Sequence, residues 1–190
     1  DLNGNLARLK QSFRNATDLV VRRFLSAPDK TPAALVYLDG LTDKNAVLNN
    51  VLRNLIYERA DRDVDFRTSV GGAVAAASWP DIEHAVLSGQ SVLFVDGHFE
   101  ALLIDTQGWP QRAIEDPQLE ASLKGAHQGF VETAIQNVAL IRRYIPNREL
   151  QVKKINVGAR GKAAVYIMYL ADVASPELLA ELEKRISGLN

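Results

Sequence analysis

The residue types that carry nucleophilic and metal chemistry are few and scattered in this sequence. Cysteine is absent, and the three histidines, His84, His98 and His127, show no H-x-x-x-H or H-E-x-x-H spacing. A zinc site would therefore lack its usual ligands. The sequence also has no thiol nucleophile and no G-x-S-x-G turn that would present a serine to a substrate. We therefore expect a protein that is not an enzyme and that holds no metal or cofactor.

The run Gly158-Ala159-Arg160-Gly161-Lys162 resembles a phosphate-binding loop only in part. Such a loop needs a glycine five residues before Gly161, where Asn156 stands, and a serine or threonine after the lysine, where Ala163 stands. The run instead predicts a β-turn with a basic tip.

Three aspartates follow apolar runs and could place carboxylates at strand ends, where ligands of α/β proteins often bind. They are Asp39, Asp96 and Asp105. Turn formation explains Asp39-Gly40 and Asp96-Gly97 equally well. No acid and base are fixed together, which argues against a hydrolase. One hypothesis is a small-molecule binding module with a cleft between two subdomains, lined by Asp39, Asp96, Arg112 and Asn137.

Residues 112–143 combine a polar segment with an apolar helical stripe. On a helix, Glu132 and Arg143 lie on the face opposite this stripe. Asn137 lies close to the edge of the stripe, where its amide would be half-buried and would need a hydrogen-bond partner. One interpretation is a solvated face with a single satisfied amide.

The other interpretation is a polar lock, in which Arg112 or Arg142 pairs with Glu120 or Glu132 and fixes a long loop onto the helix. An ion pair of this kind would explain how a long irregular segment stays ordered. The residues proposed for the lock are Arg112, Glu115, Glu120, Glu132, Asn137, Arg142 and Arg143.

The composition limits the class of protein that these residues can belong to. The 190 residues include 22 Lys and Arg against 23 Asp and Glu, and 47% are hydrophobic. A near-neutral, apolar-rich chain favours a folded domain over a disordered one and argues against a nucleic-acid binder. No apolar run approaches the roughly 20 residues that span a bilayer. Because the chain begins at Asp1 and its one methionine is Met168, we expect a fragment of a larger protein.

Apolar spacing predicts the elements of the first half. Helical spacing runs through 6–24 and returns over 46–57, and Ser78 begins a helix that Gly89 ends. Residues 33–38 form an apolar run typical of a buried strand. Residues 91–95 and 99–105 flank Asp96-Gly97 and predict a β-hairpin.

The second half predicts two helices around two strands. A helix over 129–145 has its apolar stripe at Phe130, Ala134, Val138, Ile141 and Ile145. Residues 150–157 and 163–170 alternate like strands. A last helix begins at Pro176, with Leu178, Leu179, Leu182 and Ile186 facing inward.

The pattern of apolar and polar residues changes near residues 108–111, and this change divides the chain. We therefore predict an α/β fold of two small subdomains, 1–110 and 111–190, each with a mixed sheet flanked by helices.

One long pattern resembles a known family. Residues 112–143 read R-x-I-E-x-P-x-x-E-x-x-x-K-G-x-x-x-G-F-x-E-x-x-x-x-N-x-x-L-I-R-R, which resembles the signature of the GerA-type A subunits of bacterial spore germinant receptors. L-V-Y-L-D-G-L over 35–41, L-S-G over 87–89, V-L-F-V-D-G over 92–97 and Trp109 agree with it. The departures are Asp116 and Lys124, where the family usually has Glu and Arg, Ala126, where it usually has Pro, and His127, where a basic residue is common. Lysine cannot form the two-pronged contact of arginine, although the charge pattern is kept.

The resemblance implies the soluble, non-catalytic N-terminal domain of a membrane protein, made of two α/β subdomains. In that family the domain faces the cytoplasm of the spore core, and the A subunit works with B and C subunits in the spore inner membrane, where nutrient sensing leads to germination. A related sporulation membrane protein shares the domain type. The implied roles are coupling or subunit assembly, with a small-molecule nutrient as a further candidate partner.

Basic residues gather between positions 142 and 162, where seven lysines and arginines accompany one acid, Glu149. One interpretation is a solvated face. The other is a surface that lies against anionic lipid or an acidic partner.

Overall fold

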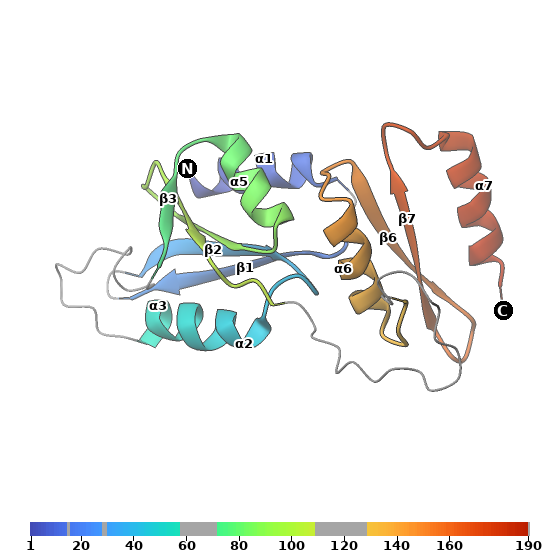
Figure 1. Cartoon of the computed structure of the whole chain (residues 1–190), viewed down its shortest axis with the longest axis horizontal. Helices are drawn as coiled ribbons and strands as arrows, with labels where there is room; N and C mark the ends of the chain where they lie inside the picture. The colour runs from blue at the N-terminus through green and yellow to red at the C-terminus, as the bar shows by residue number, and fades with distance from the viewer. Residues whose placement is uncertain (15, 28–29, 58–71, 109–128, 190) are drawn as a thin grey trace, which may run out of the picture.

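The computed structural model describes residues 1–14, 16–27, 30–57, 72–108 and 129–189. We call the described residues up to 108 the N-terminal lobe, and residues 129–189 the C-terminal lobe (Figure 1). The N-terminal lobe contains α1 (Leu2–Ser12), β1 (Leu19–Ser26), β2 (Thr31–Leu38), α2 (Lys44–Ala46), η1 (Val47–Leu52), α3 (Arg53–Tyr57), β3 (Val74–Ala76), α5 (Trp79–Leu87), β4 (Ser91–Val95) and β5 (Ala101–Ile104). The C-terminal lobe contains α6 (Ala134–Tyr144), β6 (Leu150–Val157), β7 (Ala163–Leu170) and α7 (Pro176–Ser187).

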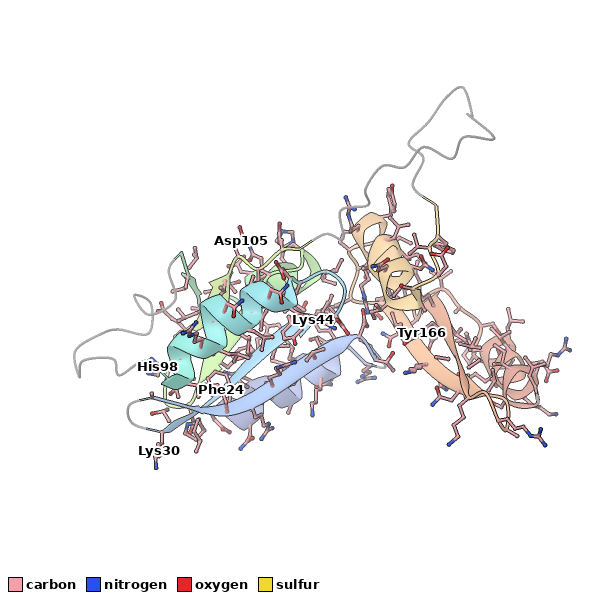
Figure 2. The ribbon with its side chains drawn as sticks, turned by 90° about the horizontal axis from the view of Figure 1, so that it is seen from below. Phe24, Lys30, Lys44, His98, Asp105 and Tyr166 are labelled. Carbon is pink, nitrogen blue, oxygen red and sulfur yellow. The ribbon has the colours of Figure 1, made fainter. Side chains whose placement is uncertain are left out.

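A five-stranded sheet forms the centre of the N-terminal lobe. Its strand order is β1-β2-β4-β5-β3, and each neighbouring pair is antiparallel. Helices α1 and α5 cover one face, and the continuous helical segment α2–η1–α3 covers the other (Figure 1). Figure 2 shows the segment α2–η1–α3 lying across this second face of the sheet. Lys44 lies at the end of the segment nearer the C-terminal lobe, and the side chains of Lys30 and His98 lie at the opposite end of the N-terminal lobe.

Strand β2 lies between these two layers, which explains its unbroken apolar run. Val36 and Leu38 pack into the core beneath α1 and α5, whereas Leu35 and Tyr37 pack into the core beneath α2–η1–α3. Successive side chains of a strand point to opposite faces, so a strand covered on both faces must be apolar throughout. The predicted buried strand is therefore confirmed.

The hairpin predicted from Asp96-Gly97 is also confirmed. Strands β4 and β5 pair from Ser91↔Ile104 to Leu93↔Leu102. Gly97 has a φ of 80°, which only glycine adopts without strain.

The helix predicted over 6–24 is wrong in its second half. Helix α1 ends at Ser12, and Val20 and Phe24 lie in β1, which pairs with β2 along its whole length. Leu6, Leu9 and Phe13, which carry the helical spacing in the first half, are buried. The apolar spacing of the later residues fits a helix, but the pairing with β2 overrides it because β1 gains a full ladder of hydrogen bonds.

Two strands and two helices form the C-terminal lobe. Strands β6 and β7 pair antiparallel from Leu150↔Leu170 to Val157↔Ala163, with the boundaries that the alternation predicts. The turn between them uses positive φ at Gly158 (86°) and Lys162 (42°). In Figure 1, α6 lies between the five-stranded sheet and β6, and α7 lies beyond β7.

The stripe of α6 differs from the predicted one. The helix begins at Ala134, so Phe130 precedes it and is 67% exposed, and Ile145 is 38% exposed. The buried positions are Val138, Ala139 and Arg142. In this orientation α6 buries the charged side chain of Arg142, and a buried charge needs a partner of opposite charge.

Helix α7 begins at Pro176 as predicted, but it lacks the predicted buried face. Ser175 Oγ accepts a hydrogen bond from the Leu178 backbone N–H. Within α7 itself no residue is buried, and Leu178 is 69% exposed. Of the four apolar side chains expected to face inward, Leu179 and Ile186 are half-buried, whereas Leu178 and Leu182 are exposed. Helix α7 packs along β6 partly through the Lys153–Glu183 ion pair at 2.6 Å.

The α/β fold class with helices against sheets is confirmed. The sheets are antiparallel and not mixed as predicted, because every pair of neighbouring strands in the two described sheets runs antiparallel. The expected boundary near residue 110 adjoins residues 109–128, which lie outside the described ranges, so the division into 1–110 and 111–190 stays a prediction. Among the described helices, none is long and apolar enough to cross a membrane.

Candidate functional site at the junction of the two lobes

A buried ion pair joins the two lobes. Arg142, in the last turn of α6, donates from Nε to Asp18 Oδ2 at 2.6 Å and from Nη2 to Oδ1 at 2.9 Å. Both side chains are only 1% exposed. Two parallel, charge-assisted hydrogen bonds form the two-pronged contact that arginine makes with a carboxylate. The pair therefore fixes the orientation of α6 as well as its distance from the N-terminal lobe.

The fold places Asp18 just before β1, beside the end of β2. Its carbonyl accepts a hydrogen bond from the Asp39 backbone N–H at 2.8 Å. Gly40 follows, with a φ of 86°, and a Cβ built there would lie 3.0 Å from both Ala139 Cβ and the Ile135 carbonyl oxygen. Two features therefore require glycine at position 40: the left-handed backbone conformation and the close approach of α6.

Strand β6 is attached to the same segment. The Thr17 backbone N–H and its Oγ1 both donate to the Val152 carbonyl, at 3.0 and 2.8 Å. Ala16 and Val152 form an isolated parallel bridge. We call Ala16, Thr17, Asp18, Gly40, Arg142 and Val152 together the inter-lobe junction.

The charges of the junction have a thermodynamic consequence. Removing an arginine or carboxylate from water costs several kcal/mol, which only a partner with good geometry offsets. Loss of one partner of such a pair typically costs about 3–5 kcal/mol, because the other charge stays buried. Arg142 Nη1 makes no hydrogen bond to any of the described residues. The connection between the lobes therefore depends on both partners of the pair being present.

Asn137 has the partner that its position predicts. Its Oδ1 accepts from the Val131 N–H, and its Nδ2 donates to the Val131 carbonyl, both at 2.7 Å. The half-buried amide therefore fastens the residues that precede α6 to the helix itself.

The structure gives the remaining lock residues different surroundings. Arg112, Glu115 and Glu120 lie outside the described residues. Glu132 and Arg143 are both exposed. Arg142 contacts Asp18 and not Glu132, the described carboxylate considered for it, because α6 turns this arginine toward the N-terminal lobe. A lock formed with residues 112–120 stays a prediction.

Sequence reasoning missed Asp18 altogether. It is separated from Arg142 by 124 positions, and no motif spacing connects the two. The available signal was an arginine on the predicted helix beside its apolar stripe, which would need a buried carboxylate from elsewhere.

The three aspartates expected at strand ends, of which Asp39 and Asp96 are cleft candidates, each contact another group of the N-terminal lobe. Asp39 forms an ion pair with Lys44 at 2.8 Å. Asp96 Oδ1 accepts from the Leu2 N–H at 2.9 Å, at the beginning of α1, and Asp105 Oδ1 accepts from the Gln107 N–H at 3.3 Å. Of the three contacts, that of Asp105 lies within its own turn, whereas that of Asp96 joins residues 94 positions apart.

A cavity of about 520 Å³ lies between the lobes, but the described cleft candidates Asp39, Asp96 and Asn137 do not line it. Its walls come from α1, α5 and the strands of the C-terminal lobe. The lining residues are Arg8, Gln11, Ser12, Arg14, Trp79, Glu83, Arg148, Glu149, Gln151, Tyr169 and Ala171. Across the described ranges, no group of three or more histidine, aspartate or glutamate side chains is placed to hold a metal ion.

Comparison with known proteins places the chain among spore germination proteins. A family model described as Bacillus/Clostridium GerA spore germination protein matches residues 7–190. The chain is 28% identical over 194 residues to spore germination protein KA of Bacillus subtilis (strain 168), covering 98% of this chain and 36% of that protein. It is 30% identical over 200 residues to spore germination protein GerLA of Bacillus cereus, covering 100% and 41%.

A sporulation protein and a solved domain are also similar. Stage V sporulation protein AF of Bacillus subtilis (strain 168) is 33% identical over 200 residues, covering 98% of this chain and 40% of that protein. The chain thus spans about two fifths of the length of these curated relatives. The crystal structure of the N-terminal domain of the A subunit of the Bacillus megaterium spore germinant receptor GerK3 matches with a TM-score of 0.77 and 25% identity, covering 100% of this chain and 72% of that one.

Proposed function

The chain belongs to the GerA family of spore germination proteins, and we propose that it is the N-terminal domain of a membrane-bound germinant-receptor A subunit. We further propose that the domain is non-catalytic and couples nutrient sensing, or subunit assembly, to germination. The match over residues 7–190 and the likeness to the A-subunit domain of GerK3 support the assignment. Similarity to a stage V sporulation protein makes a related sporulation membrane protein the nearest alternative.

The observation that carries the coupling role is the inter-lobe junction. The buried Asp18–Arg142 pair and the Thr17–Val152 hydrogen bonds attach both α6 and β6 to one short segment of the N-terminal lobe. Packed interfaces of this kind move as units rather than deforming continuously. A displacement imposed on one lobe would therefore be passed to the other, which suits a passive coupling element.

The wider setting follows from the resemblance as part of the same proposal. The domain would face the cytoplasm of the spore core and reach the spore inner membrane through segments outside this chain. Its partners would be B and C subunits of the receptor. A nucleic-acid partner is not part of the proposal, because 22 basic residues against 23 acidic ones give no general phosphate-binding surface.

Charge reversal in spores tests the coupling role. The full-length protein would carry Arg142→Glu, which places two carboxylates together in the buried junction, or Glu132→Arg on the exposed face beside α6. We expect a lower receptor level in spore membranes, or slower loss of optical density after nutrient addition, for both variants. Immunoblots separate an assembly defect from a coupling defect, because only the first lowers the receptor level.

Arg185→Glu in α7 is the matched control, since the Arg185 side chain is 77% exposed and contacts only Glu181 on the same helix among the described residues. Normal receptor levels together with normal germination in both Arg142→Glu and Glu132→Arg spores would contradict the proposed role.

The cavity between the lobes favours a second candidate function. A volume of about 520 Å³ lies within the range of small-molecule sites, and both lobes contribute to its walls. The domain would then bind a small molecule between its lobes, at residues other than Asp39, Asp96 and Asn137. Amide shifts of the cavity residues on titration with small molecules would support this function, and an absence of shifts at millimolar concentrations would count against it.

A further inference from the structure

The β6–β7 hairpin of the C-terminal lobe repeats the β1–β2 hairpin of the N-terminal lobe. All four strands are eight residues long, and both hairpins are antiparallel. Strand β1 reads L-V-V-R-R-F-L-S and β6 reads L-Q-V-K-K-I-N-V, with a leucine, a valine and two basic residues at matching positions. Strands β2 and β7 read T-P-A-A-L-V-Y-L and A-A-V-Y-I-M-Y-L, and both end in Tyr-Leu.

The two hairpins also share their backbone geometry. The Asp39 N–H donates to the Asp18 carbonyl at 2.8 Å, and the Ala171 N–H donates to the Glu149 carbonyl at 2.9 Å. Each of these bonds lies one residue beyond the end of the paired strands, so the two hairpins have the same register. The helix that follows packs along the first strand in both lobes, α3 along β1 and α7 along β6.

The two lobes differ at the outer edge of the second strand. Strand β2 lies between β1 and β4, and it is buried from Ala33 to its end. Strand β7 has β6 as its sole neighbour among the described strands, and only Ile167 of its residues is buried. The sequence of β7 contains no charged residue, proline or glycine. Such a run is typical of a strand inside a sheet, whereas open edges usually carry charges or proline.

The bond at Ala171 identifies the backbone groups at the open edge of β7. In an antiparallel pair, every second residue directs its N–H and C=O to the partner strand, and the residues between direct theirs away. Because Ala171 faces β6, the N–H groups that point away from β6 are those of Ala164, Tyr166 and Met168. We call them the open-edge amides. None of them donates a hydrogen bond to another described residue.

In β2, the corresponding backbone groups face β4. Pro32 takes the place of Ala164, and its carbonyl accepts a hydrogen bond from the Asp96 N–H at 2.9 Å, just beyond the end of β4. The next two such residues, Ala34 and Val36, lie in the β2–β4 ladder. The open-edge amides therefore occupy the positions that a strand equivalent to β4 would bind.

Helix α7 adds an apolar side that nothing described covers. Leu178 and Leu182, four residues apart, lie on one side of the helix and are 69% and 39% exposed. Leu189, just after the helix, is also exposed. The C-terminal lobe thus presents an open strand edge together with exposed apolar helix residues, which is typical of a surface that another segment covers.

The similar proteins are longer than this chain, which covers 72% of the GerK3 domain and about two fifths of the curated relatives. In the N-terminal lobe, β4 follows the helical segment that comes after β2. We propose that an apolar strand of the longer protein, after Asn190, pairs antiparallel with the open edge of β7, and that the same segment covers Leu178 and Leu182. The inference depends on family membership and not on the coupling role or the cavity.

Hydrogen exchange tests this pairing at single amides. The full-length protein in detergent is compared with the 190-residue chain by mass spectrometry with electron-transfer fragmentation, which resolves neighbouring amides. We expect the open-edge amides to exchange at least about a hundredfold more slowly in the full-length protein, because they are hydrogen-bonded there. The N–H groups of Val165 and Ile167, which face β6, are the internal control for the hairpin.

Each outcome decides the proposal. Equal, fast exchange of the open-edge amides in the two proteins would show an open edge and overturn it. Slow exchange already in the 190-residue chain would place their partner within that chain or in a second copy, which also overturns it. Protection that falls on dilution of the full-length protein has the same meaning. If Val165 and Ile167 also exchange fast in the 190-residue chain but slowly in the full-length protein, the hairpin itself needs the added segment, which supports the proposal.

A pair of proline variants of the full-length protein provides a second test. Met168→Pro removes an N–H that the added strand would bind, so Val165 and Ile167 should exchange about tenfold faster, as the loss of one ladder hydrogen bond predicts. Ala164→Pro is the matched control, because β2 itself carries Pro32 at this position, and it should leave their exchange unchanged. Equal exchange in the two variants would overturn the pairing.

Discussion

At the scale of single residues, Asp18 and Arg142 depend on each other because both charged side chains are buried away from solvent. Both side chains are 1% exposed, and the two hydrogen bonds between them, at 2.6 and 2.9 Å, replace the lost hydration. Each charge alone would be unfavourable in this place, so the pair should behave as one unit in mutational tests.

A double-mutant cycle tests this dependence. We expect Arg142→Met to lower the free energy of unfolding by about 3–5 kcal/mol, because it leaves the Asp18 carboxylate buried and unpaired. Asp18→Leu should cost a similar amount. The double variant should recover most of the loss, since apolar replacement of a whole buried pair is often close to neutral. Urea unfolding measures all three values, and a double-variant loss equal to the sum of the single losses would contradict the coupling.

A second residue-scale prediction concerns Glu177. The Ser175 hydroxyl donates a hydrogen bond to Glu177 Oε2 at 2.6 Å, which, with help from the Glu177 backbone N–H, lowers the pKa of this carboxyl below its ordinary value. The carboxylate therefore stabilises the fold at pH values above the unfolded pKa, and this contribution is lost as the pH falls through the lower folded pKa. Ser175→Ala should raise the pKa of Glu177, as measured by an NMR titration. Ser187→Ala, at the other end of α7, is the control and should leave the pKa of Glu177 unchanged. If the pKa of Glu177 were equal in the two variants, the Ser175 hydroxyl would not be the cause of its lowering.

Local chemistry explains which residue contacts could be predicted. Asn137 contacts Val131, six positions away, so its half-burial and need for a partner follow from the helical stripe alone. The partner of Arg142 lies 124 positions away and is determined by how α6 packs on the N-terminal lobe. A stripe identifies a face of a helix but not the segment that the face will meet.

At the scale of elements, close approach decides where α6 can lie. Gly40 ends the turn after β2, and α6 passes so near that Ile135 O and Ala139 Cβ would each be 3.0 Å from an added methyl group. The same turn carries the Asp39 N–H that bonds to the Asp18 carbonyl. One glycine thus serves both the turn and the helix contact.

A pair of glycine substitutions separates these two effects. Gly40→Ala should lower the free energy of unfolding by more than the roughly 1–2 kcal/mol that a left-handed backbone costs an L-residue, because α6 must also shift. Gly97→Ala is the control: its φ of 80° is similar, but nothing lies within 4 Å of the added methyl group. Chemical denaturation gives both values. Equal losses would mean that α6 does not press on Gly40.

Elements with strong local signals could be predicted from the sequence, whereas those that depend on tertiary pairing could not. The β4–β5 and β6–β7 hairpins follow from alternation and turn residues. The spacing predicts a helix over the residues of β1, because Val20 and Phe24 fit a helical repeat as well as a strand. For α7, spacing predicted an apolar face correctly but not its exposure, since burial depends on what packs against it.

At the scale of the whole molecule, we expect the two lobes to act as one body. The contacts between them include the inter-lobe junction and the Arg148–Glu83 ion pair, which lies at the cavity to which both lobes contribute. A receptor domain built in this way would transmit a displacement without any chemistry of its own, and a ligand in the cavity would tighten the same connection.

Native-state hydrogen exchange tests this claim most directly. In the wild-type chain, the slowest amides of β6 should exchange with the same free energy of opening as those of β2, because the lobes open together. In Arg142→Met, β6 should open at a clearly lower free energy than β2, since the ion pair that joins α6 to the N-terminal lobe is gone. If the amides of β6 and β2 keep a common opening free energy in Arg142→Met, or already open separately in the wild type, the junction does not unite the lobes.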